Sequence, residues 1–172
     1  MNSKIVKQSD KCAFIIVTYN SVNDIQECIN SIKEFHPECG IYVVDNNSSD
    51  GTSDLLSSIR DINLTLLPVN SGFSGGNNYA IKKALSDNYE YVFLFNPDSR
   101  LTSKIIDSLI NLSSTKKSLV GPVIYNFDAK TIQSVGGKYN PLFSHFRVDQ
   151  DLSSDNNYKK VDWILGASLF IS

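Results

Sequence analysis

Short apolar runs alternate with amphipathic stretches over the first two thirds of the chain. The apolar runs are rich in β-branched and aromatic residues, as strands buried on both faces are, and they occupy residues 12–18, 41–44, 62–67 and 91–95. Between these runs, apolar residues recur every three or four positions and predict helices over residues 25–35, 55–59, 79–85 and 105–112. The alternation predicts an α/β fold of Rossmann-like type, with a mostly parallel central sheet and helices on both faces.

The loops that follow the predicted strands are polar and rich in turn-forming residues, and they occupy residues 18–20, 45–51, 70–78 and 96–99. In a sheet built of right-handed βαβ units, these loops gather at the carboxyl edge, where ligands bind. Residues 69–77 are predicted to be a loop of glycine, asparagine and serine. We expect a helix to begin near Asn77, with an N-terminus that would favour a phosphate, although a plain helix-capping turn explains this loop equally well. The four loops therefore predict one ligand site.

The last third of the chain has a different pattern. We expect a strand over residues 120–125, a glycine-rich and polar region up to residue 157, and a strand over residues 161–171 that a glycine interrupts. Residues 1–11 are a polar leader, so one domain is predicted over residues 12–172. No helix follows the final apolar run to cover it, which predicts a domain incomplete at its C-terminus and favours pairing of two chains in a homodimer.

Charge and cysteine content narrow the class of protein. The net charge is -2 and the basic residues are scattered among acidic ones, so no basic face for nucleic acid is expected. No apolar run is long enough to span a bilayer and no signal peptide is present, so any membrane contact would be peripheral. The three cysteines lack metal-ligand spacing and predict free thiols in the cytoplasm, with Cys12 and Cys28 in the core. His36 and His145 also lack metal-ligand partners and are expected at the surface.

Two aspartates are the candidate chemical groups at the predicted ligand edge. Asp45 ends the second predicted strand and can accept hydrogen bonds from a nucleobase or a ribose. Asp98 follows an Asn-Pro pair that ends the fourth strand, and its carboxylate can ligate Mg²⁺ or Mn²⁺ beside diphosphate oxygens. Turn chemistry alone explains either aspartate, whereas both at one edge favour a site. Ser48 and Ser49 have no base positioned with them, so the sequence offers no nucleophilic serine.

Four segments in a fixed order resemble the family 2 glycosyltransferases of GT-A fold. They are FIIVTYN at residues 14–20, VVDNNSSDGT at 43–52, NSGFSGGNN at 70–78 and FNPD at 95–98. The segment VDWILGAS at 161–168 also fits, and the likeness is greatest to the bacterial rhamnosyltransferase-like branch that builds surface polysaccharides. The resemblance runs from about Cys12 to the last residue, and four ordered motifs are far more specific than any single one.

The resemblance implies inverting transfer of a sugar from a nucleoside-diphosphate donor, a dTDP- or UDP-sugar, to a glycan or lipid-linked acceptor. It also implies Mg²⁺ or Mn²⁺ on the diphosphate and a location in the cytoplasm at the inner face of the membrane. By this likeness Asp98 holds the metal, and the nucleotide is bound by Thr18, Tyr19, Asn20, Asp45, Asn77, Asn78 and Asn96. The family's metal motif usually has two acids flanking one residue, and Asn96 stands in place of the first.

The family's general base removes the proton of the acceptor hydroxyl and is an acid that follows the Gly-Ala strand. The resemblance therefore implies a base beyond Ser172, with no catalytic residue assigned within the chain, because Asp162 precedes the Gly-Ala step. The alternative function is a nucleotide-sugar-binding module that transfers nothing. A nicotinamide-dependent oxidoreductase is disfavoured because the first strand lacks the glycine fingerprint of that class.

Overall fold

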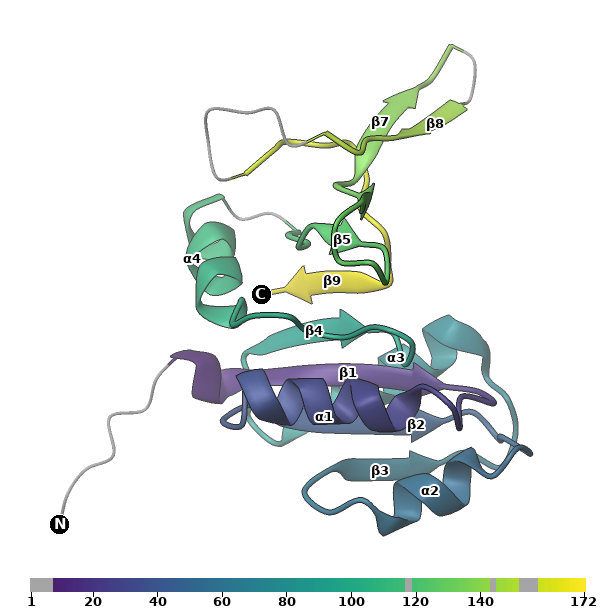
Figure 1. Cartoon of the computed structure of the whole chain (residues 1–172). Helices are drawn as coiled ribbons and strands as arrows, with labels where there is room; N and C mark the ends of the chain where they lie inside the picture. The colour runs from purple at the N-terminus through teal and green to yellow at the C-terminus, as the bar shows by residue number, and fades with distance from the viewer. Residues whose placement is uncertain (1–7, 117–118, 143–144, 152–157) are drawn as a thin grey trace, which may run out of the picture.

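The computed structural model describes residues 8–116, 119–142, 145–151 and 158–172, and a five-stranded sheet lies at its centre (Figure 1). In spatial order the strands are β3 (Asn63–Leu66), β2 (Gly40–Asp45), β1 (Cys12–Thr18), β4 (Tyr91–Phe95) and β9 (Ser168–Ile171). The first four are parallel to one another, and β9 pairs antiparallel with β4. The predicted mostly parallel sheet is confirmed, and the first four strands lie within one residue of their predicted ends.

Helices cover both faces of this sheet, as the sequence pattern predicts. Helices α1 (Ile25–Phe35), α2 (Thr52–Ser58) and α4 (Ile106–Lys116) pack on one face, and α3 (Gly72–Ser86) packs on the other. Successive residues of β1 alternate between the two, so that Phe14 and Ile16 join the core under α1 while Ile15 and Val17 join the core under α3. Each such fully buried side chain contributes about 1.5–3 kcal/mol. Cys12 and Cys28 are fully buried in the first core, as predicted.

Helix α3 begins at Gly72, so the loop predicted over residues 69–77 is mostly the first turns of a helix. Gly72 has a φ of 72°, which residues with a side chain rarely adopt. At Gly76, a Cβ atom would lie 2.7 Å from Cγ1 of Val17, which is closer than packed carbon atoms approach. The prediction of a helix start near Asn77 is therefore wrong. Glycine weakens a helix in isolation, but here it permits α3 to lie close against β1.

The last third of the chain contains shorter strands than the sequence predicts. Two small hairpins are present, formed by β5 (Ile124–Tyr125) with β6 (Ile132–Ser134) and by β7 (Gly137–Asn140) with β8 (His145–Val148). The strand predicted over residues 120–125 is reduced to β5, because Val120 instead forms a single bridge to Phe170 of β9. The strand predicted over residues 161–171 is reduced to β9, because a turn at residues 166–167 interrupts it. Figure 1 shows the β7–β8 hairpin projecting away from the central sheet.

His36 is buried at 2% exposure, so its predicted surface position is wrong. Its Nε2 accepts a hydrogen bond from the backbone N–H of Ile105 at 3.0 Å, and its Nδ1 lies 3.0 Å from Oε1 of Glu38. The imidazole thus joins the end of α1 to the start of α4, where N–H groups lack partners within the helix. The side chain of His145 lies outside the described residues, as do residues 1–7 of the predicted leader. The rest of the leader forms a short 3₁₀ helix, η1 (Gln8–Lys11).

Candidate functional site

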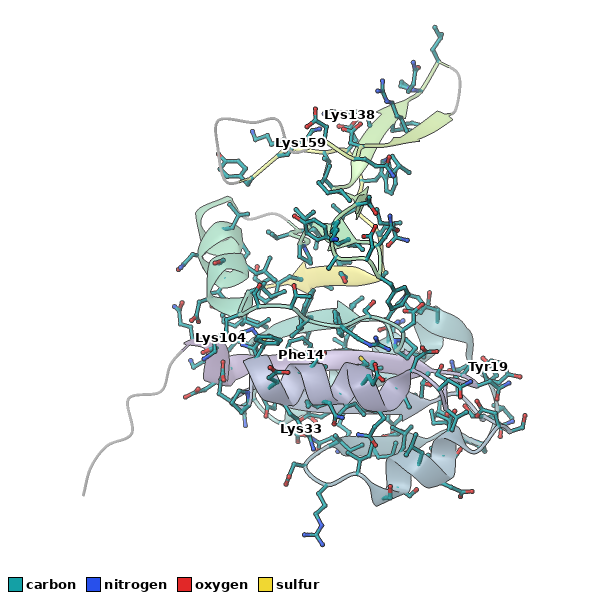
Figure 2. All side chains as sticks on the ribbon, in the orientation of Figure 1. Phe14, Tyr19, Lys33, Lys104, Lys138 and Lys159 are labelled. Carbon is teal, nitrogen blue, oxygen red and sulfur yellow. The ribbon has the colours of Figure 1, made fainter. Side chains whose placement is uncertain are left out.

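The carboxyl end of β1 carries a buried hydroxyl. Thr18 is the last residue of β1 and is 1% exposed, and its Oγ1 has no hydrogen-bond partner among the described residues. Leaving a buried hydroxyl unpaired costs about 1–3 kcal/mol. Tyr19, the next residue, is 52% exposed, and Figure 2 shows it beyond the end of β1. Thr18 and Tyr19 thus provide a polar group and an exposed aromatic ring at the predicted edge.

Asp45 lies beside Thr18 in the neighbouring strand, in register with it. The residue is 1% exposed, and its carboxylate accepts three hydrogen bonds. Ser48 donates its hydroxyl to Oδ1 at 2.5 Å and its backbone N–H to Oδ2 at 3.1 Å, and the Ser53 hydroxyl donates to Oδ2 at 2.9 Å. A buried carboxylate requires such donors to offset its lost hydration. Asp45 therefore holds the loop after β2 against the start of α2.

The loop after β1 is fastened to the loop after β2. The backbone N–H of Asn20 donates to the Ser48 hydroxyl at 2.8 Å, and Oδ1 of Asn20 accepts the N–H of Ser49 at 2.9 Å. Further along, the backbone N–H of Val22 donates to Oδ2 of Asp50 at 3.1 Å. Because both loops supply donors and acceptors to each other, Asn20 and Asp45 lie in one network of hydrogen bonds, as the strand order predicts.

Asp50 is the second acid of this network, and sequence reasoning did not single it out. The hydroxyl and the backbone N–H of Thr52 donate to its Oδ1 at 2.5 and 3.0 Å. These hydrogen bonds, with that from Val22, hold the pKa of Asp50 below its ordinary value. The buried Thr52 hydroxyl in turn accepts the N–H of Ser21 at 2.9 Å. The ionised carboxylate of Asp50 therefore holds the loop after β1 and the loop after β2 together.

Asn46 is a further residue that sequence reasoning missed. It is 2% exposed, and its Nδ2 donates to the carbonyl oxygen of Gly72 at 3.0 Å. Its Oδ1 accepts the N–H of Ser71 at 3.0 Å and the Ser71 hydroxyl at 3.1 Å. Asn46 thus anchors the start of α3 to the end of β2. In the sequence, two adjacent asparagines follow Asp45, and no pattern distinguishes the buried one from the exposed Asn47.

The start of α3 has the polarity that suits an anion. No acidic residue occurs in its first turn, and the hydroxyl of its N-cap residue, Ser71, does not bond to the helix. Asn77 is 5% exposed and donates its amide to the carbonyl oxygen of Phe73 at 2.9 Å, within the same helix. Asn78 is exposed. The two asparagines predicted beside the donor therefore lie one turn further into α3 than expected, and one of them is already hydrogen-bonded.

The end of β4 presents Asp98 to solvent. The backbone N–H of Asn96 donates to the carbonyl oxygen of Ala167 at 3.0 Å, and Ser99 closes the turn by donating to the carbonyl of Asn96 at 3.1 Å. Asp98, between them, is exposed. One carboxylate displayed in this way fits a Mg²⁺ or Mn²⁺ ion, because Mg²⁺ is commonly held by one or two carboxylates together with substrate phosphates and water.

A separate group of metal-type ligands lies at the other end of the strands. Among the described residues, ligand atoms of His36, Glu38 and Cys39 lie within 4.8 Å of one another, which corrects the expectation that His36 has no such neighbours. Because Nε2 of His36 accepts a backbone N–H, the proton of the neutral ring sits on Nδ1, which faces Glu38. That nitrogen cannot ligate an ion without losing its proton. This group is therefore a structural cluster.

Asp162 lies away from the ligand edge, against the β7–β8 hairpin. Its Oδ2 accepts the N–H of Tyr139 at 3.1 Å, and its Oδ1 lies 3.4 Å from Nζ of Lys138. Figure 2 shows Lys138 and Lys159 at this hairpin side of the molecule, with Tyr19 at the far end of the sheet. A shallow hollow of about 490 Å³ is lined by Lys138, Tyr139, Asn140, Pro141, Arg147 and Asp162. The hollow is thus separate from the edge that carries the predicted site residues.

Comparison with known proteins identifies the family. Residues 13–158 match the family model described as glycosyl transferase family 2. The low-salt glycan biosynthesis hexosyltransferase Agl10 of Haloferax volcanii is 31% identical over 169 residues, which are 95% of this chain and 53% of that protein. The dTDP-rhamnosyl transferase RfbF of Shigella flexneri is 29% identical over 116 residues, which are 66% of this chain and 38% of that protein. The chain thus spans about half or less of the length of these relatives.

A solved structure agrees with this assignment. Residues 1–349 of TarS from S. aureus, crystallised in complex with UDP, superpose on this chain with a TM-score of 0.53 and 26% sequence identity. The match covers 63% of this chain and 33% of that chain. The predicted GT-A fold is confirmed, as is the likeness to rhamnosyltransferases. Among the described residues, no helix combines the length and the apolar character that crossing a membrane requires. The chain belongs to glycosyl transferase family 2.

Proposed function

We propose that the chain is the donor-binding part of an inverting, metal-dependent transferase that moves a sugar from a nucleoside diphosphate to a glycan or lipid-linked acceptor in surface-polysaccharide biosynthesis. Family membership supports transfer of a sugar. The nucleotide-binding residues are those expected from the sequence: Thr18, Tyr19, Asn20, Asp45, Asn77, Asn78 and Asn96. Asp98 is the metal ligand.

The observation that carries this proposal is the buried hydroxyl of Thr18, which has no partner among the described residues. It lies where the loops after β1 and β2 are bonded together, in register with Asp45. A polar group of a ligand at this edge would satisfy the hydroxyl and offset its cost. Backbone N–H groups at the start of α3, on the opposite face of the sheet, would favour the diphosphate.

A divalent cation fits the end of β4. Asp98 would hold it from one side, and donor phosphate oxygens would complete its coordination. The ion supplies charge that stabilises the departing diphosphate. The chain's own contribution is to fix this turn, because the N–H of Asn96 is bonded to Ala167 and the N–H of Ser99 to Asn96. With Asn96 in place of the first acid, the site has one protein carboxylate, and metal binding would depend on the nucleotide.

The donor is proposed to be a dTDP- or UDP-sugar. One relative is named a dTDP-rhamnosyl transferase, and one similar structure was solved with UDP. Uracil and thymine both carry a ring N–H that can donate a hydrogen bond. The carboxylate of Asp45, at the carboxyl edge of the sheet, can accept it. These features favour a pyrimidine nucleotide whose ring carries that N–H.

The test is isothermal titration with UDP, dTDP and GDP, each with Mn²⁺ and with EDTA. We expect one of the pyrimidine nucleotides to bind, and its affinity to fall when EDTA removes the metal. CDP serves as the matched control, because cytosine has no ring N–H at the position in question. Absence of binding by all of these nucleotides, in protein shown to be folded by circular dichroism, would reject the proposal.

A nucleotide-sugar-binding module that transfers nothing is the second candidate. The observation that favours it is the position of Asp162. Its carboxylate bonds to Tyr139 and Lys138 of the β7–β8 hairpin, so it is not at the ligand edge to take the proton of an acceptor hydroxyl. Release of free sugar or transfer to an acceptor, measured with a radiolabelled donor, distinguishes the candidates. Binding without turnover supports the module, and turnover supports the transferase.

The protein is also proposed to work in the cytoplasm, at the inner face of the membrane of a bacterium. All three cysteines are free thiols, two of them buried, which suits a reducing compartment. Fractionation of cells that produce a tagged chain, with and without a salt wash of the membranes, tests this location.

A further inference from the structure

The hydroxyl of Ser48 links two separate parts of the ligand edge. It donates to Oδ1 of Asp45 at 2.5 Å, and it accepts the backbone N–H of Asn20 at 2.8 Å. Asp45 ends β2, whereas Asn20 belongs to the loop after β1. The backbone N–H of Ser48 adds a third hydrogen bond, to Oδ2 of Asp45 at 3.1 Å. One side chain therefore bridges the carboxylate of one loop and the backbone of the next.

The conformation of Asn20 depends on this bridge. Its φ is 53°, in the left-handed region that residues other than glycine rarely occupy. Oδ1 of Asn20 accepts the N–H of Ser49 at 2.9 Å, so two successive serines hold its backbone and its side chain. Such a conformation persists only where the surroundings fix it. Removing the hydroxyl of Ser48 would take away the backbone half of that support.

A nucleophilic role does not fit Ser48. An activated serine hands its proton to a base such as histidine, and its oxygen stays open to the substrate. Here the proton lies toward a carboxylate, which is a weak base, and a backbone N–H occupies a lone pair of the oxygen. Both bonds serve to hold neighbouring groups in place.

We propose that Ser48 is a positioning residue of the donor site, which sets the orientation of Asp45 and fixes Asn20 beside it. This rests on the proposed function, in which both residues contact the nucleotide. Because Asp45 is only 1% exposed, its orientation decides whether a carboxylate lone pair reaches a ligand at all. A fixed acceptor would favour uracil, thymine or guanine, which carry a ring N–H, over cytosine, which has an acceptor nitrogen there.

Four variants separate positioning from general stabilisation. Ser48→Ala removes both bonds of the hydroxyl, and Ser48→Thr keeps a hydroxyl at the same atom position. Ser53→Ala removes one hydrogen-bond donor to Asp45, and Ser53 has no bond to Asn20. This variant therefore measures the effect of the Asp45 orientation alone. Ser57→Ala is the neutral control, because among the described residues its exposed hydroxyl bonds only to the carbonyl of Ser53 within α2.

Two measurements are made on each variant. The first is affinity for the nucleotide that binds the wild-type protein and for CDP, both with Mn²⁺. The second is hydrogen exchange at the amide of Asn20 in the free protein. For Ser48→Ala we expect about tenfold weaker nucleotide binding, a smaller preference over CDP, and faster exchange at Asn20. Ser48→Thr should restore all three, and Ser53→Ala should weaken binding without changing the exchange of Asn20.

The results that overturn the proposal are distinct from failure of the proposed function. If the wild-type protein binds no nucleotide, the proposed function fails, and exchange at Asn20 still decides whether Ser48 fixes this loop. If Ser48→Ala keeps the wild-type preference over CDP, or leaves the Asn20 amide equally protected, Ser48 has no positioning role. Faster exchange at Asn20 with unchanged nucleotide preference would make the residue a structural one only.

Discussion

Asp45 and Asn46 are consecutive residues whose side chains leave the end of β2 toward opposite faces of the sheet. Asp45 bonds to Ser48 and Ser53 on the α2 side, and Asn46 bonds to Ser71 and Gly72 on the α3 side. The alternation of side chains along a strand produces this division. Two adjacent polar residues thus fasten the loops after β2 and β3, and both sides of the candidate site depend on the register of one strand.

Asn46→Ala is expected to lower the free energy of unfolding by about 1–3 kcal/mol, because it removes the hydrogen bonds that the buried amide of Asn46 makes to Ser71 and Gly72 at the start of α3. Urea unfolding followed by circular dichroism measures the change. Asn63→Ala is the matched control, because Asn63 is exposed on the edge strand β3 and should change stability little. Equal stability of the two variants would contradict the anchoring role of Asn46.

Asp98→Ala is expected to abolish the effect of Mn²⁺ on nucleotide affinity while leaving the melting temperature unchanged. Asp98 is exposed and lies in a turn that backbone hydrogen bonds close, so its side chain is not needed for the fold. Titration of the variant with and without EDTA measures the effect. Glu34→Ala, an exposed acid near the far end of α1, provides the control. If nucleotide affinity still depends on Mn²⁺ in Asp98→Ala, Asp98 is not the metal ligand.

Gly76→Ala is expected to destabilise the fold by about 1–3 kcal/mol, because the added Cβ meets the side chain of Val17 at 2.7 Å. Adding Val17→Ala should recover part of this loss, since the double variant removes the clash. Thermal unfolding of Gly76→Ala, Val17→Ala and the double variant, each compared with wild type, measures the coupling between the two substitutions. Gly166→Ala is the control, because the nearest atom to its new Cβ would be Cε1 of Phe73 at 3.9 Å. Additive effects of the two substitutions would show that this contact is not tight.

The stability of the protein at acid pH should depend on the ionisation of Asp50. The hydroxyl of Thr52, with nearby backbone N–H groups, holds the pKa of Asp50 below its ordinary 3.8 in the folded protein. Its stabilising contribution is therefore present above pH 3.8 and is lost as the pH falls through the lower folded value. Asp50→Asn should unfold more easily than wild type near neutral pH, and the difference should vanish in strong acid.

Asp128 provides the control for this prediction. Backbone N–H groups of Thr131 and Lys130 likewise lower its pKa, but it lies in the turn between β5 and β6. Asp128→Asn should change the pH dependence of stability in acid in the same direction and leave nucleotide affinity unaltered. Asp50→Asn, in contrast, should weaken nucleotide binding at neutral pH. An equal loss of affinity in both variants would mean that the effect of Asp50 is not local.

The first four strands and their helices follow from sequence pattern because the core decides them. Phe14 and Ile16 must be buried on one face and Ile15 and Val17 on the other, which leaves a short apolar run no alternative to a central parallel strand. The gathering of Thr18, Asn20 and Asp45 at one edge follows from the same topology. The register of Thr18 with Asp45 and the hydrogen bonds that join Asn20 to Asp45 through Ser48 confirm it.

Other features depend on contacts between residues distant in sequence. Gly76 is a poor helix residue by propensity, and only the close approach of Val17, where a Cβ atom would clash, explains why glycine stands at this position of α3. His36 is polar and precedes a proline, and its burial follows from the N–H of Ile105, which is far along the chain. The role of Asn46 is hidden for the same reason, because its partners come from the next loop.

The strand β9 lies directly beside β4 in the sheet, although α4 and both small hairpins intervene in the sequence. Joining such distant segments costs more chain entropy than joining β1, β2, β3 and β4, which follow each other closely. We therefore expect the four parallel strands to assemble first and β9 to dock afterwards. The hydrogen bond from Asn96 to Ala167 would then form only after β9 has docked, so the turn that carries Asp98 would reach its final shape later than the four parallel strands.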